Sequence, residues 1–140
     1  MLRSIPHLLF DGTCAEAMAF YRDCFGGELT LSKLGDTPMK ASFPSEKHNR
    51  IINATLKSDI IEISAADWMA APEYLPHPGN TFSILITGGT MDETRPLFEK
   101  LSVGANKDRF QALHDLPFGI YGQLTDRFGT GWIFVAQKGS

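Results

Sequence analysis

Long apolar runs and blocks of like charge are both missing from this sequence of 140 residues. No apolar stretch approaches the roughly 18 residues that cross a bilayer, and the first residues lack the apolar core of a signal peptide. The formal net charge is -3, with acidic and basic residues interspersed, whereas a nucleic-acid-binding domain carries a basic face. We therefore expect a cytoplasmic protein that binds neither membranes nor nucleic acids.

Cysteine is scarce, which limits both disulfides and metal sites. Cys14 and Cys24 lie ten positions apart on one predicted helix, a rise of about 15 Å, so they cannot form a disulfide with each other. No Cys-x-x-Cys pair or zinc-finger spacing occurs, and free thiols fit a reducing compartment. Cys14 falls in the first helical turn, where the helix dipole can lower a thiol pKa. The alternative is a thiol that only packs against the sheet.

Glycine-rich phosphate loops are absent as well. Gly26-Gly27 and Gly88-Gly89 have neither the Gly-x-Gly-x-x-Gly nor the Walker spacing, and we interpret them as turns. No nucleophile elbow occurs, and no Ser-His-Asp arrangement can be assigned. The sequence therefore offers no recognisable nucleotide-binding loop or catalytic triad.

What the sequence does contain is a repeat with an offset of 77 residues. Thr13 with Glu16, and Thr90 with Glu93, both have the Thr-x-x-Glu spacing of a capping box, which marks a helix start. The residues that follow have apolar side chains at helical spacing in both copies. Pro96 falls in the second turn of the second helix and lacks a backbone donor, so that helix either starts later or kinks.

Strand patterns fill the rest of both halves. We predict strands at residues 5–10, 28–34, 51–57, 60–64, 82–87, 110–113, 121–125 and 132–136. Each half then has the order strand, helix, strand, strand, strand. The prediction is a single α+β domain of two β-α-β-β-β modules, residues 1–68 and 80–138, joined by a loop at 69–79.

Segments near both ends of the sequence resemble a known family. Residues 10–21 and 25–29 resemble the opening of the PhnB-like branch of the vicinal oxygen chelate (glyoxalase/bleomycin resistance/dioxygenase) superfamily. Residues 118–132 resemble its closing hairpin, with the signature Thr-Asp-x-Phe-Gly-x-x-Trp that begins at Thr125. The resemblance covers nearly the whole chain. It implies curled mixed sheets that form a half-barrel, with a cavity for a small ligand.

In metal-dependent members of the superfamily, the first and last strands of each module hold one divalent ion. Carried over to this chain, the four ligand positions fall on Pro6, Glu62, Ser83 and Val135. Only Glu62 has a suitable side chain, whereas transition-metal sites normally use at least three protein ligands. We therefore expect no cofactor. The alternative is one divalent metal ion held by Glu62 and by His7, which neighbours Pro6.

The resemblance and the composition together nominate site residues. Glu62 is the candidate acid, base or ligand, with a solvent-facing strand position as the alternative. His114 precedes a loop that lies by the cavity mouth in related proteins, and Asn53 stands where this branch often has histidine. Aromatic residues suit a cavity wall as well as a core. The expected ligand-binding residues are His7, Asn53, Phe82, His114, Phe118, Tyr121 and Trp132.

Three functions follow from these residues. The first is a metal-free protein of the bleomycin-resistance type that binds a small organic molecule. The second is a metal-dependent lyase, isomerase or dioxygenase-type enzyme that uses Glu62, His7 and a nonstandard third ligand. The third, a methyltransferase, is disfavoured because no glycine-rich loop is present for S-adenosylmethionine. In each case we expect a homodimer, because most small soluble oligomers are two-fold.

Overall fold

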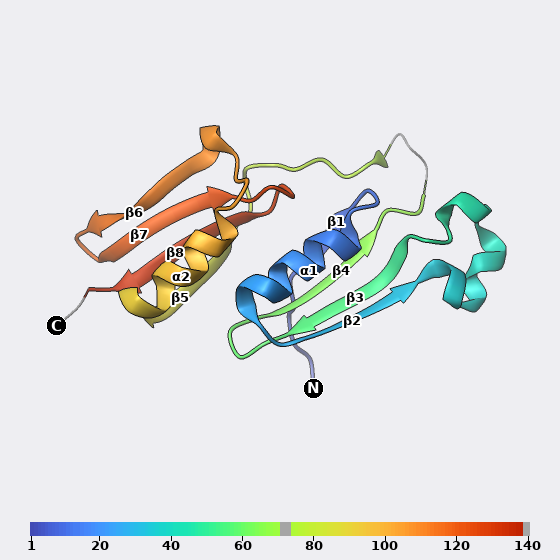
Figure 1. Ribbon diagram of the computed structural model, residues 1–140, viewed down its shortest axis with the longest axis horizontal. Coiled ribbons are helices and arrows are strands. Elements are labelled where there is room, and N and C mark those ends of the chain that lie inside the picture. The colour runs from blue at the N-terminus through green and yellow to red at the C-terminus, as the bar shows by residue number, and fades with distance from the viewer. Residues whose placement is uncertain (71–73, 139–140) are drawn as a thin grey trace. The chain divides into compact units, whose positions relative to one another are not determined.

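The computed structural model describes residues 1–70 and 74–138, and it divides the chain into two compact units, Met1–His77 and Pro78–Ser140. Each unit has the predicted order of strand, helix and three strands (Figure 1). Part of the predicted joining loop, residues 71–73, lies outside the described residues. No helix among the described residues combines the length and the apolarity that crossing a bilayer requires.

Unit 1 is a four-stranded mixed sheet with one helix. Its strands are β1 (His7–Phe10), β2 (Glu28–Lys33), β3 (Ile51–Lys57) and β4 (Glu62–Asp67), in the spatial order β1-β4-β3-β2. The β1 strand is parallel to β4, and the other pairs are antiparallel. The predicted loop between β2 and β3 contains three short 3-10 helices, Leu34–Asp36, Pro38–Ser42 and Ser45–Lys47.

Helix α1 (Cys14–Phe25) covers one face of this sheet (Figure 1). Burial alternates along β4, so Ile63 and Ala65 are buried while Glu62 and Ser64 remain partly exposed on the opposite face. This alternation is the period of two expected for a strand with one covered face. The helix ends at Gly26, whose φ of 75° only glycine adopts readily. The core therefore lies between α1 and the sheet, and the other face carries the polar side chains.

The predicted capping box at the start of α1 is wrong. Thr13 makes no side-chain capping bond. The carboxylate of Asp67, at the end of β4, instead accepts hydrogen bonds from the backbone N–H groups of Gly12 (2.8 Å) and Cys14 (3.0 Å). Its second oxygen accepts from the N–H of Ile51 at 2.9 Å. A buried acid 53 residues away along the chain therefore caps this helix, because its carboxylate satisfies donors that the helix itself cannot.

Unit 2 repeats this topology, but different hydrogen bonds stabilise its helix and its turns. Its strands are β5 (Ile84–Thr90), β6 (Phe110–Leu116), β7 (Gly119–Thr125) and β8 (Gly131–Gln137), in the spatial order β5-β8-β7-β6. The first pair is parallel and the others are antiparallel. The strand predicted at 82–87 begins two residues later, so Phe82 precedes the sheet rather than belonging to it.

Helix α2 (Met91–Leu101) confirms the second capping box. Thr90 Oγ1 accepts from the Glu93 N–H at 3.2 Å, and Glu93 Oε1 accepts from the Thr90 N–H at 3.0 Å. Pro96 lies inside the helix, which nevertheless begins at Met91. The possibility that this helix starts later is therefore wrong.

The signature near the C-terminus builds the turn between β7 and β8. Asp126 is 2% exposed, and its Oδ1 accepts from the backbone N–H groups of Phe128 (2.8 Å) and Thr130 (3.1 Å). Its Oδ2 accepts from the indole Nε1–H of Trp132 at 2.8 Å. Trp132 is fully buried, so one carboxylate fixes both the turn and the largest core side chain. The Asp and Trp of the signature therefore have a structural role.

Candidate functional site

The face of the unit 1 sheet opposite α1 carries two rows of polar side chains. Residues paired across neighbouring strands point to the same face, so the strand registers define these rows. One row crosses all four strands and consists of His7, Ser64, Thr55 and Thr30. The next row consists of Glu62, Lys57 and Glu28. We call this surface the polar face of unit 1.

A hollow of about 430 Å³ opens on the polar face around Glu62. It is lined by Arg3, Ile5, Glu28, Thr30, Thr55, Lys57, Glu62 and Ser64. Arg3 Nη1 donates to Glu62 Oε1 at 3.1 Å, and the two side chains are 63% and 24% exposed. The carboxylate is therefore partly shielded and engaged by a cation that is itself largely in solvent. Such an exposed pair contributes little stability, so Glu62 is available to another partner.

His7 lies on the same face as Glu62. The His7 side chain is exposed, and its Nδ1 is 2.9 Å from the hydroxyl oxygen of Ser64. The neighbouring Pro6 uses its backbone carbonyl to accept the Ser64 N–H at 2.9 Å. Asn53 is exposed on β3, where it pairs with Ser32 and does not line the hollow. The structure thus brings His7 and Glu62 onto one surface, and Asn53 lies on the same face of β3 as Thr55 but outside the hollow.

These side chains do not fit a tightly held transition metal. No group of three or more His, Cys, Asp or Glu residues suited to a metal ion occurs among the residues that the structure describes. His7 and Glu62 offer only two donors. Because such ions take three or more protein ligands, we derive no chemistry through a metal at this site.

Three of the predicted ligand-binding residues gather at the β6–β7 hairpin of unit 2. The rings of His114 and Phe118 both stand edge-on to Tyr121, with centroids 5.9 and 6.5 Å away. His114 Nδ1 is 2.7 Å from the carbonyl oxygen of Ala112, and the Tyr121 hydroxyl donates to Gln123 Oε1 at 3.1 Å. Phe118 is 67% exposed. This aromatic group provides an apolar contact surface with one polar edge.

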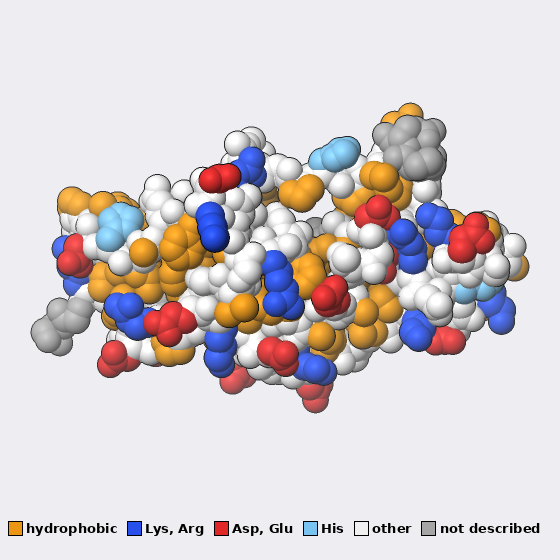
Figure 2. Space-filling model, turned by 45° about the horizontal axis from the view of Figure 1, so that its top comes forward, with side chains coloured by type: hydrophobic (Ala, Val, Ile, Leu, Met, Phe, Trp, Pro, Cys, Tyr) orange, Lys and Arg blue, Asp and Glu red, His pale blue; other side chains and the backbone are white. Residues whose placement is uncertain are grey.

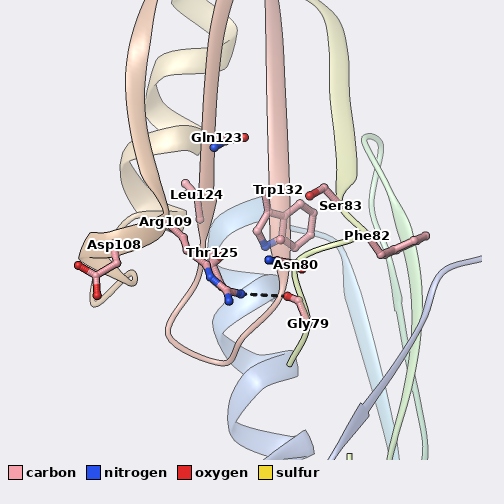
Figure 3. A pocket seen from close by; sticks show the side chains of 11 residues that line it. Gly79, Asn80, Phe82, Ser83, Asp108, Arg109, Gln123, Leu124, Thr125 and Trp132 are labelled. Carbon is pink, nitrogen blue, oxygen red and sulfur yellow. Dashed lines mark hydrogen bonds between the residues drawn. The ribbon is translucent and has the colours of Figure 1, made fainter. Parts of the chain in front are cut away.

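The other two predicted aromatics lie elsewhere. Trp132 and Phe82 border a hollow of about 210 Å³ at the start of β8 (Figure 3). Trp132 is completely buried and bonded to Asp126, so it serves the core, whereas the Phe82 ring is 70% exposed and directed away from it. Neither residue joins the aromatic group at the hairpin.

The Cys14 thiol is not activated by the helix that it begins. Burial first, and the nearby Asp67 carboxylate second, raise the pKa of Cys14 from 9.0 to about 12. The side chain is completely buried. The possibility that the helix dipole lowers this pKa is therefore wrong, because the thiol stays protonated at neutral pH and out of reach of reagents.

Sequence reasoning missed Arg3, Thr55 and Ser64, although a signal for two of them was present. Thr55 and Ser64 are the polar members of alternating strands, and pairing β3 with β4 would have placed them side by side. Arg3 precedes β1 and carries no such pattern. Over the face shown in Figure 2, acidic and basic side chains are interspersed rather than gathered by sign.

Comparisons with known proteins agree with this geometry. A family model described as 3-demethylubiquinone-9 3-methyltransferase matches residues 3–135. The chain belongs to this family, the PhnB-like branch of the vicinal oxygen chelate superfamily. The structure of protein PA1353 from Pseudomonas aeruginosa is similar, with 27% identity, a TM-score of 0.83, and 99% of this chain and 100% of that chain covered.

Two further structures share the fold of this PhnB-like protein. The PhnB protein from Bacillus cereus has 22% identity and a TM-score of 0.72, with 96% of this chain and 99% of that chain covered. A glyoxylase/bleomycin resistance protein/dioxygenase domain from Frankia has 15% identity and a TM-score of 0.62, with 98% of both chains covered. The family model thus confirms the predicted family, and these two structures confirm the fold of two mixed sheets, which do not close into barrels.

Proposed function

We propose that this PhnB-like protein binds a small organic molecule on the polar face of unit 1, without a metal ion, and that Glu62 is the principal hydrogen-bond acceptor. The observation that carries the proposal is the hollow of about 430 Å³ around the Glu62–Arg3 pair. Its volume lies within the range of known small-molecule sites. Six of its eight lining residues come from the adjacent strands β2, β3 and β4, and Arg3 and Ile5 come from the segment before β1.

The lining predicts the kind of ligand. Hydroxyl groups of Ser64 and Thr55 both donate and accept, and Glu62 accepts only. Lys57 stands beside Glu62 in register. A ligand with several hydroxyl or amino groups suits this set, since its donors would meet the carboxylate and its acceptors would meet Lys57.

Two enzymatic alternatives remain less well supported. The shared face of His7 and Glu62 favours a metal-dependent enzyme, but two donors are too few for a tight site. The family's description names methyl transfer, yet this sequence has no glycine-rich loop of the kind that binds nucleotides. We therefore favour the binding of a small molecule without catalysis over both enzymatic functions.

A thermal-shift screen with Glu62→Gln tests the proposal. We expect polar small molecules that raise the melting temperature of the wild-type protein to lose most of that effect in Glu62→Gln, because the amide cannot replace a charged acceptor. Glu99→Gln is the matched control, since Glu99 is exposed on α2 and lies outside the hollow. Ligands that act equally on both variants would place binding elsewhere.

A further inference from the structure

A charged row crosses the three strands that line the hollow on the polar face of unit 1. Lys57 on β3 is paired in register with Glu62 on β4 on one side and with Glu28 on β2 on the other. Side chains directly opposite each other on one face of a sheet have Cβ atoms about 4.5–5.5 Å apart. One cation therefore stands between two carboxylates, and all three side chains line the hollow of about 430 Å³.

The central cation of this row makes no ion pair in the described part of the chain. Neither the Arg3–Glu62 pair nor the Arg50–Asp11 pair involves Lys57 or Glu28, and no other described residue lies within ion-pair distance of these two side chains. Lys57 and Glu28 are both exposed. An ammonium group and a carboxylate on the wall of the hollow are therefore open to a ligand.

Glu62 also keeps part of its capacity to accept hydrogen bonds. Its pair with Arg3 uses one carboxylate oxygen, Oε1, at 3.1 Å. An ionised carboxylate has about four lone-pair sites, so the second oxygen can accept from another cation. The Arg3 side chain is 63% exposed, and an ion pair this exposed is weak. The hollow thus presents two carboxylates for a positive group beside one ammonium group for a negative group.

A row of hydroxyl groups runs beside the charged row. Thr30, Thr55 and Ser64 are paired in register across the same three strands, each two positions from the charged residue of its strand. All three line the same hollow. Because a hydroxyl group both donates and accepts, this row discriminates little between polar groups. The charged row therefore determines which charges the ligand carries, and the hydroxyl row contacts its neutral polar part.

We propose that this hollow is selective for a small zwitterion, a molecule with an ammonium group and a carboxylate a few bonds apart. The carboxylate of the ligand binds Lys57 and its ammonium group binds Glu62 and Glu28, so each end meets an opposite charge. A purely cationic ligand would lie against Lys57 without an anion to offer it, and a purely anionic ligand would lie against two carboxylates. Zwitterion selectivity rests on the function proposed above and names the ligand class for the same surface.

Three probes that differ in one group test this selectivity: L-serine, serinol and L-glycerate. Serinol has a hydroxymethyl group in place of the carboxylate of serine, and glycerate has a hydroxyl group in place of its ammonium group. Each is titrated into the isotope-labelled full chain at low ionic strength, and NMR follows the backbone N–H signals of Thr55, Lys57 and Ser64. We expect serine to bind about tenfold more tightly than either of the other probes, because each of those lacks one charge-assisted contact.

Lys57→Gln and Glu28→Gln separate the two charges of the ligand. Lys57→Gln should weaken serine binding about tenfold and leave serinol binding no weaker, because serinol has no carboxylate. Glu28→Gln should weaken the binding of serine and serinol but not that of glycerate. Lys33→Gln is the control of equal charge, since Lys33 is exposed on β2 and does not line the hollow. Thermal unfolding of each variant verifies the fold.

Equal affinity for serine and serinol, or a loss of serine binding in Lys33→Gln as large as in Lys57→Gln, would overturn zwitterion selectivity. Serinol binding that is lost in Glu62→Gln would still support the proposed function, which does not require a ligand with both charges. The absence of localised shifts with serine would also overturn the selectivity, and the thermal-shift screen with Glu62→Gln would then decide the proposed function separately.

Discussion

Asp126→Ala is expected to destabilise unit 2 by about 4 kcal/mol, near the upper end for a single substitution. The substitution removes the acceptor of three hydrogen bonds, which the N–H groups of Phe128 and Thr130 and the buried indole N–H of Trp132 donate. Each unsatisfied buried donor costs about 1–3 kcal/mol. Urea denaturation followed by tryptophan fluorescence measures the loss.

The matched control is Asp115→Ala, because Asp115 is exposed on β6. It should change the free energy of unfolding by no more than about 0.5 kcal/mol. The free energy of unfolding of Asp126→Asn should lie between those of Asp126→Ala and Asp115→Ala, since an amide keeps one acceptor oxygen. An Asp126→Ala protein as stable as Asp115→Ala would show that the signature has no structural role.

Asp67→Ala is expected to have a comparable effect on unit 1. The Asp67 carboxylate accepts from the N–H groups of Gly12, Cys14 and Ile51, and it is 4% exposed. Its loss uncaps α1 and leaves buried donors unsatisfied, at a cost of about 4 kcal/mol. Hydrogen exchange should show faster exchange of the α1 amides than in the wild-type protein.

Asp23→Ala controls for the loss of an acid in unit 1, because Asp23 is exposed on α1 itself. Its exchange rates and unfolding midpoint should stay close to those of the wild-type protein. If Asp67→Ala left the α1 amides protected, Thr13 would have to supply the cap that the capping box predicts.

The sequence predicts the fold well because its signals are local. Capping-box spacing, helical apolar spacing and alternating strands placed both helices and all eight strands within a few residues. The Thr90–Glu93 box formed because both partners belong to one helical turn. The Thr13–Glu16 box did not form, and the Asp67 carboxylate on a distant strand instead accepts from the N–H groups of Gly12 and Cys14. Local spacing cannot reveal a partner so far away in the sequence.

The candidate sites were only partly predictable for the same reason. Glu62 and His7 were nominated together as the ligands of an alternative metal site, and the strand registers place them on one face. Trp132 was nominated for a ligand, but the Asp126 carboxylate holds it in the core. Which side chains converge depends on sheet register and turn geometry.

The central claim is that the polar face of unit 1 serves a ligand without a tightly bound metal. It is tested most directly by the metal content of the purified protein after incubation with zinc, nickel, manganese or iron and exhaustive dialysis. Because His7 and Glu62 supply only two donors, we predict far less than one ion per chain with each metal. Near-unit occupancy that is lost in Glu62→Gln would contradict the account.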